Sequence, residues 1–125
     1  MGLLSGLLGL TSDVDIAEVR DDLAPVLIEG ETVTLAFKVV RDLMVFTERR
    51  LILVDKQGLT GSKRRILSIP YRAITSFAIE TAGRFDADSE MTVHVSGQAP
   101  IKRELSRSAN ISGIQKALAT GVLGS

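Results

Sequence analysis

The chain has 125 residues, 45% of them hydrophobic and 24% charged, a balance typical of one globular domain and not of a disordered chain. Cysteine is absent, which excludes a disulfide framework, a thiolate nucleophile and a cysteine-based metal site, and which favours a cytoplasmic protein. Fifteen acids balance fifteen bases, and no run approaches the roughly 18 apolar residues of a membrane span.

The charges are unevenly distributed along the chain. Residues 1–37 contain seven acids and one base, a net charge of −6, whereas residues 38–72 contain nine bases and three acids, a net charge of +6. Blocks of opposite sign can neutralise each other within the fold or between subunits. The basic block therefore does not predict a nucleic-acid partner, and we expect none.

The first 30 residues form a segment of their own. Its start is rich in leucine and glycine, and leucine side chains left in water cost about 25 cal/mol per Å² of apolar surface. We therefore expect this start to be buried, most simply between subunits. The candidate contacts in a homo-oligomer are Leu3, Leu4, Leu7 and Leu8.

A helix is expected next. Ser12 and Asp15 have the spacing of a capping box, and Pro25 disfavours continuation of the helix. Apolar residues recur on one face, at Val14, Ile16, Val19 and Leu23. This amphipathic helix can pack on its own domain or on a neighbouring subunit, and the sequence leaves both open.

Seven strands are expected after this segment. Alternating apolar and polar residues, or short apolar runs bounded by turn residues, are typical of strands. The expected strands cover residues 32–39, 43–46, 51–55, 65–69, 74–81, 91–96 and 101–105. Their spacing of roughly ten residues favours a meandering antiparallel sandwich or barrel.

The chain then changes to a helical pattern. Asn110 or Ser108 can cap a helix over about residues 109–122. Its apolar residues recur at helical spacing, at Ile111, Ile114, Leu118 and Val122. This stripe should face the sheet, so that the helix plugs one open end of the sandwich.

Three stretches resemble the bacterial pleckstrin-homology (PH)-like domains, a family once grouped as a domain of unknown function. They are VRDLMVFTERRLILVDKQG (residues 40–58), IPYRAI (69–74) and ETAGRFD (80–86). The resemblance covers nearly the whole chain. It implies a mainly β domain over residues 31–125, a seven-stranded bent antiparallel barrel capped by a C-terminal helix, with residues 1–30 as an added helical segment.

The resemblance also implies a tendency to homo-oligomerise and no catalytic residues. Eukaryotic members of the wider fold often bind phosphoinositides through a long basic loop between their first two strands. Here that connection is reduced to about residues 40–42, where Asp42 lies beside Arg41. Phosphoinositide binding is therefore not carried over to this chain.

Motifs for catalysis or metal binding are not found. His94 is the one histidine, so a multi-histidine zinc site is excluded, and no serine has the GxSxG context of a triad. Asp86, Asp88 and Glu90 alternate across a loop without the downstream acid of a calcium site. We expect no catalytic residue, no metal, no cofactor and hence no enzyme activity.

One concentrated basic patch remains, formed by Lys63, Arg64 and Arg65 and expected to include Arg72. It could hold an anionic headgroup or an acidic peptide. Alternatively, it is a solvated hairpin edge that discourages strand-to-strand aggregation.

Two non-catalytic functions are therefore left open. The first is a scaffold that self-associates and binds another protein, through the apolar start, the acidic first helix and exposed strand edges. The alternative is a peripheral membrane adaptor whose basic hairpin meets anionic lipid. The leucine-rich start argues against the adaptor, because it contains no basic residue and its glycines weaken an interfacial helix.

Overall fold

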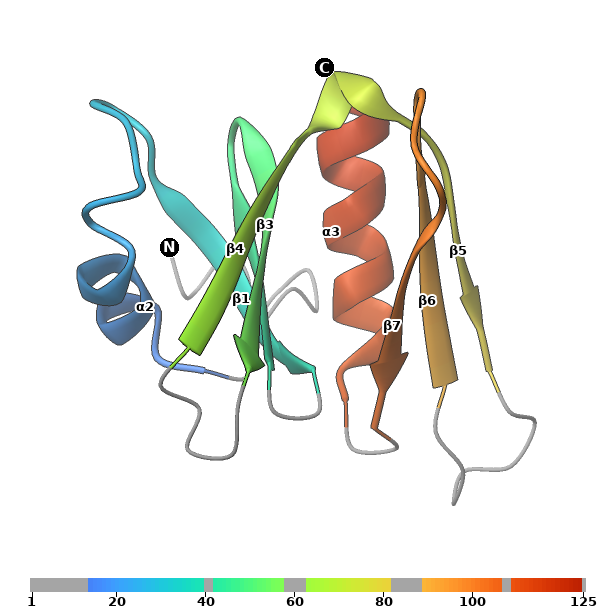
Figure 1. The fold of residues 1–125 in the computed structure, drawn as a ribbon, viewed down its shortest axis with the longest axis horizontal. Coiled ribbons are helices and arrows are strands. Elements are labelled where there is room, and N and C mark those ends of the chain that lie inside the picture. Colours follow the sequence, from blue (N-terminus) through green and yellow to red (C-terminus); the bar gives the residue numbers. More distant parts are fainter. Residues whose placement is uncertain (1–13, 40–41, 58–62, 82–88, 107–108, 125) are drawn as a thin grey trace.

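The computed structural model describes residues 14–39, 42–57, 63–81, 89–106 and 109–124. Within them a short helix precedes seven strands, and a longer helix follows (Figure 1). The elements are α2 (Ile16–Asp22), β1 (Val33–Val39), β2 (Asp42–Thr47), β3 (Arg50–Gln57), β4 (Lys63–Pro70), the 3-10 turn η1 (Tyr71–Ala73), β5 (Ile74–Glu80), β6 (Ser89–Val95), β7 (Ile101–Leu105) and α3 (Ile111–Leu123). All seven predicted strands and the predicted C-terminal helix are confirmed.

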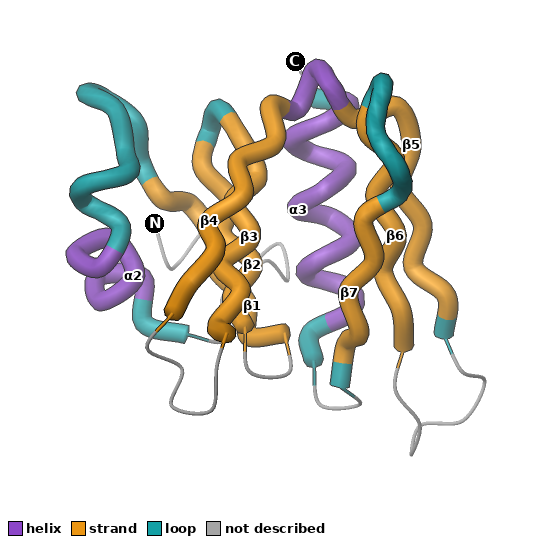
Figure 2. Tube along the Cα trace, viewed as in Figure 1, coloured by secondary structure: helices purple, strands orange, loops and turns teal. Residues whose placement is uncertain are grey.

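The strands form two antiparallel sheets in chain order. The first sheet has the order β1-β2-β3-β4 and the second has the order β5-β6-β7. The 3-10 turn η1 joins β4 to β5, and the two sheets diverge from it (Figure 2). Within each sheet every strand pairs with its neighbours along the chain, as expected for a meander.

Strands β1 to β3 of the first sheet are largely buried on both faces, whereas β4 is mostly exposed. The inner face of this sheet belongs to the main core. There the rings of Phe37 and Phe46 pack edge to face, with their centroids 5.8 Å apart. The outer face of the sheet belongs to a second apolar cluster that includes Ala36, Val45 and Ile52. The expectation that β1 is half-buried is therefore wrong at Ala36, which is fully buried because another element covers that face.

The covering element is α2. Val19 and Leu23 point into the second cluster and are 5% and 0% exposed, so this helix packs on its own domain (Figure 1). The helix begins later than the capping box suggests, at Ile16, because Asp15 is itself the N-cap and accepts a hydrogen bond of 2.9 Å from the Ala17 N–H. Ser12 lies outside the described residues.

The helix α3 fills the angle between the two sheets (Figure 1). Asn110, one of the two predicted caps, is its N-cap and accepts a hydrogen bond of 2.9 Å from the Gly113 N–H. Ile114 and Leu118 are fully buried in the main core, which confirms the predicted stripe. No helix in the described part of the chain is long and apolar enough to cross a membrane.

The last turn of α3 is held against η1 by close packing. The Tyr71 ring lies where a side chain at Gly121 would extend, and its hydroxyl donates a 2.7 Å hydrogen bond to the Thr47 carbonyl. Burial raises the pKa of Tyr71 above its ordinary value, so the hydroxyl stays protonated and remains a donor. The ring is therefore anchored to β2 at one end and to α3 along its side.

Replacing Gly121 by Ala should destabilise the protein by about 1–3 kcal/mol, although alanine normally favours a helix. The new Cβ would lie 2.6 Å from Cζ and 2.7 Å from Cδ1 of the anchored Tyr71 ring. Urea unfolding measures the change. The control Thr120→Ala, at the exposed neighbouring position, should stabilise slightly. A Gly121→Ala variant as stable as the parent protein would contradict the packing described.

Candidate functional site

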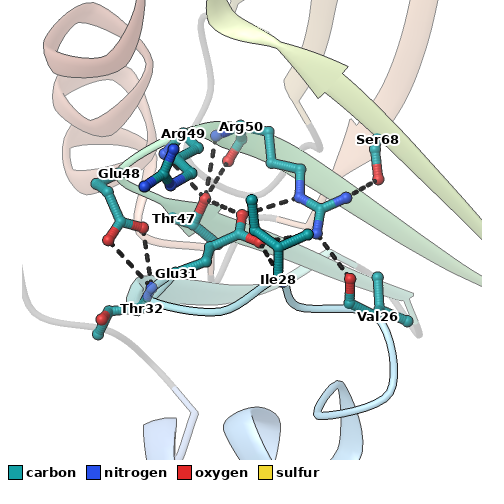
Figure 3. A network of polar contacts seen from close by, with 9 residues as sticks. All are labelled: Val26, Ile28, Glu31, Thr32, Thr47, Glu48, Arg49, Arg50 and Ser68. Atoms are coloured by element: carbon teal, nitrogen blue, oxygen red, sulfur yellow. Dashed lines mark hydrogen bonds and ion pairs between the residues drawn. The ribbon is translucent and has the colours of Figure 1, made fainter.

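A buried polar network lies where the N-terminal segment meets the β2–β3 hairpin (Figure 3). Its centre is Glu31, whose side chain is 0% exposed. The chain brings Glu31 there because the turn after α2 leads directly into β1. The hairpin places Thr47 and Arg50 opposite, at the end of β2 and the start of β3.

Four donors satisfy the Glu31 carboxylate. The Arg50 guanidinium donates from Nε at 2.9 Å and from Nη2 at 2.8 Å. The Thr47 hydroxyl donates at 2.7 Å, and the Ile28 N–H donates at 3.1 Å. The hydrogen bond from Arg50 lowers the pKa of Glu31 from 4.5 to about 2, against the opposing effect of burial.

Arg50 ties three parts of the chain together. Besides Glu31, its Nη2 donates to the Val26 carbonyl and its Nη1 donates to the Ser68 hydroxyl, each at 2.9 Å. One guanidinium thus joins the N-terminal segment, β3 and β4. Among the described residues no buried side-chain nitrogen or oxygen lacks a partner. The network therefore acts as a structural clamp, in which the Arg50 side chain donates four hydrogen bonds within the protein.

A second ion pair joins the two sheets. Arg103 of β7 donates to Asp55 of β3 from Nε at 3.2 Å and from Nη2 at 2.7 Å, and both side chains are largely buried. Such a two-point contact fixes geometry as well as charge. Arg65 lies 3.9 Å from the same carboxylate.

The predicted basic patch is divided. Lys63, Arg64 and Arg65 begin β4, whereas Arg72 belongs to η1, beyond the other end of that strand. A strand of this length separates them by about 23 Å. Two of the arginines also have acidic partners, because Arg64 pairs with Asp22 of α2 and Arg65 lies near Asp55.

The other predicted contacts are placed as follows. The four leucines Leu3, Leu4, Leu7 and Leu8 lie outside the described residues. His94 is exposed on the outer face of β6, with Ser76 opposite it on β5. No group of acids and histidines in the described ranges could hold a metal ion.

Sequence reasoning did not identify a row of three acids on the outer face of the second sheet. Glu80 of β5 lies opposite Glu90 of β6, which lies opposite Glu104 of β7. Like charges directly opposite each other destabilise a sheet. The strand register, which the sequence does not state, brings these three residues into line.

The outer edges of β4 and β5 are open along the described chain. β4 ends the first sheet and β5 ends the second, while the other two end strands, β1 and β7, contact each other. β4 carries three bases and Pro70, which discourage pairing with a foreign strand. β5 has seven residues, and its one charged residue is Glu80 at the end.

Glu31→Gln should lower the free energy of unfolding at pH 7 by about 3 kcal/mol, because it removes the charge that pairs with Arg50. The pKa of Glu31 is lower in the folded protein than in the unfolded chain. Its contribution is therefore complete above about pH 4.5 and is lost as the pH falls toward 2.

Urea unfolding of both proteins at pH 7, 4.5 and 2.5 should show the difference in stability shrinking with acid. The control Glu29→Gln changes an exposed carboxylate in the same segment and should have little effect at any pH. An equal difference between Glu31→Gln and the parent protein at all three pH values would contradict the assignment.

Comparison with known proteins places these features in a family. The family model described as Bacterial PH domain matches residues 2–122. The chain is similar to two Bacillus subtilis (strain 168) proteins named as uncharacterized. It is 52% identical to YjqA over 121 residues, which cover 95% of this chain and 97% of YjqA. It is 31% identical to YozO over 96 residues, which cover 77% of this chain and 82% of YozO.

Two crystal structures have the same fold. A pleckstrin homology domain from Shewanella amazonensis SB2B is 49% identical, with a TM-score of 0.85 over 98% of this chain and 100% of that one. A DUF1696 family protein with a pleckstrin-homology domain from Shewanella loihica PV-4 is 45% identical, with a TM-score of 0.79 over 90% of this chain and 97% of that one. The match over nearly the whole chain and the shared fold of two sheets closed by a helix show that this chain belongs to the Bacterial PH domain family.

Proposed function

We propose that this chain is a non-catalytic PH-like module that self-associates into a homo-oligomer and, as a scaffold, mediates protein interaction in the cytoplasm. The observation that carries the proposal is the open edge of β5. Six of its seven residues are uncharged, and along the described chain no strand covers its outer side.

An edge strand of this kind favours addition of another strand. Its unpaired backbone N–H and C=O groups can extend the ladder, so natural proteins usually protect such edges with lysine, proline or a bulge. β5 has a register shift between Ile74 and Ser76 but neither lysine nor proline along its length. Self-association through this edge would satisfy the backbone and bury the exposed Ala78.

The alternative, an adaptor that binds anionic lipid through the basic hairpin, has less support. Arg64 has an ion-pair partner in Asp22, and Arg72 lies at the far end of β4. Of the four predicted bases this leaves Lys63 and Arg65, and Arg65 also lies near Asp55. The remaining cationic surface is therefore small.

Ala78→Lys tests the proposal, because it places a charge in the middle of the open edge at an exposed position that the fold tolerates. Light scattering over a tenfold concentration range should give the parent protein a mass of several 13.4 kDa chains. The variant should associate more weakly, with a dissociation constant about tenfold higher than that of the parent protein.

The matched control is Ser112→Lys, which adds the same charge at an exposed position on α3. It should leave the mass unchanged. A parent protein that remains monomeric across the whole concentration range would refute self-association.

A further inference from the structure

We infer that α2 is a displaceable cover over a second binding surface, and that the outer face of the first sheet takes an acidic amphipathic helix of a partner protein in its place. This inference goes beyond the proposed function, because it uses neither the β5 edge nor association between copies of the chain. It follows from the chemistry of the covered face, from the pattern of the helix that covers it and from the way that helix is held.

The covered face is apolar from β1 to β4. Its side chains lie in two rows, which the strand register defines. One row consists of Ala36, Val45 and Ile52, and the next consists of Leu43, Val54 and Ile66. All six belong to the second apolar cluster, and four of them are fully buried. Such a face needs an apolar cover, because its exposure to water costs free energy in proportion to the apolar area.

A basic row borders these apolar rows. Lys56 and Arg64 lie opposite each other on β3 and β4. Each is two residues along its strand from the apolar row, so both point to the same outer face. Arg64 pairs there with Asp22 at the end of α2, and Lys56 is exposed. The face thus has positive charge at one end, which an acidic helix complements.

The sequence of α2 shows which kind of helix this face binds. Val19 and Leu23 are four residues apart, lie on one side of the helix and pack into the second apolar cluster. Asp22 lies three residues after Val19 and pairs with Arg64. The exposed Glu18 adds to the negative charge of the helix. A partner helix therefore needs apolar residues at positions i and i+4 and an acid at i+3.

The contacts of α2 with the sheet are ones that another helix can replace. The helix has seven residues, and so short a helix is marginal without tertiary packing. Its ion pair with Arg64 is partly exposed, at 34% for Arg64 and 50% for Asp22, and such pairs stabilise weakly. Figure 1 shows α2 on the outer side of the sheet, with no other described element beyond it. The main core lies on the opposite side of the sheet, so α2 can leave without opening that core.

The clamp sets the limit of the segment that moves. Arg50 binds the Val26 carbonyl and the Glu31 carboxylate, both of which follow α2 in the chain. It therefore fixes the chain after the helix and not the helix itself. Residues 14–25 can swing away from the sheet while the clamp and the seven strands stay in place.

The two helices would compete for one face. While α2 is docked, a partner helix meets an occupied surface, so its apparent affinity is reduced by the fraction of molecules in which α2 is displaced. A change that weakens the docking of α2 and leaves the sheet intact should therefore tighten binding of the partner. A partner that binds elsewhere on the molecule would show no such coupling.

A labelled peptide with the sequence of residues 14–28 serves as the partner helix, and fluorescence anisotropy measures its dissociation constant for the full-length protein. Leu23→Ala in the protein should lower this constant by about tenfold or more, because it weakens α2 and leaves the sheet unchanged. Glu18→Ala, the control, truncates an exposed side chain of the same helix and should change the constant by less than about twofold. Equal affinity of the peptide for the Leu23→Ala variant and the parent protein would overturn the inference.

A second variant guards against misfolding of the first. Asp22→Lys in the protein replaces the exposed ion pair with Arg64 by repulsion, and it should tighten binding of the peptide about threefold. Thermal unfolding of each variant establishes that it is folded. Binding to a folded Asp22→Lys variant that is no tighter than binding to the parent protein would also count against the inference.

Changes in the peptide locate it on the sheet. A peptide with Val19→Ser and Leu23→Ser should not bind the Leu23→Ala protein. A peptide with Asp22→Lys should bind that protein about threefold more weakly, and adding Arg64→Glu to the protein should restore the affinity, because the pair is formed again with its signs exchanged. Binding that survives the loss of both apolar residues would place the peptide elsewhere and overturn the inference.

Hydrogen exchange of the parent protein tests the displacement itself. The Val19 and Leu23 amides donate to carbonyls within the N-terminal segment. They should exchange at least about tenfold faster than the paired amides of β2 and β3, since α2 leaves the sheet while those strands stay paired. Equal protection of the helix and the two strands would mean that α2 leaves only when the whole domain unfolds, which also overturns the inference.

Discussion

A buried carboxylate held by a guanidinium, Glu31 with Arg50, is the contact on which the first half of the molecule depends. Arg50 also binds the Val26 carbonyl, so the pair keeps the N-terminal segment folded back on the first sheet. That segment covers an apolar face that would otherwise meet water. Without the pair, α2 would be held by its buried side chains Val19 and Leu23 and by the ion pair between Asp22 and Arg64.

The two sheets consequently differ in how they are covered. The first has apolar residues on both faces and is closed by α2 outside and by the core inside. The second packs one face on α3 and leaves a polar face and the β5 edge outward. The first sheet is therefore covered over most of both faces, and the second leaves one face and one edge uncovered in the described part of the chain. Function in such a domain comes from surface features carried by a common fold.

Periodicity and turn residues were sufficient to predict all seven strands and α3, with Asn110 or Ser108 as its cap, because these signals are local in sequence. The clamp was not predicted, since Glu31 and Arg50 are 19 residues apart and only the β2–β3 hairpin brings them together. Burial of Ala36 was missed for a similar reason: a helix from elsewhere covers that face. The one local signal was the pair of uninterrupted apolar runs in β2 and β3, which is typical of strands buried on both faces.

The row of acids depended on strand register, which no single segment determines. The separation of Arg72 from Lys63 required knowing that β4 is one continuous strand that ends just before η1. The sequence predicts which residues are candidates for a surface, and the pairing of strands decides which of them lie together.

The position of α3 in chain order has a consequence for biosynthesis. The helix follows all seven strands, yet Ile114 and Leu118 complete the core between the sheets. As the chain emerges from the ribosome, successive hairpins can form within each sheet, because each strand of a sheet pairs with the one before it. The apolar interior nevertheless stays open until α3 has emerged. A nascent chain paused before that point would expose the inner faces of both sheets, which makes it a natural client for chaperones.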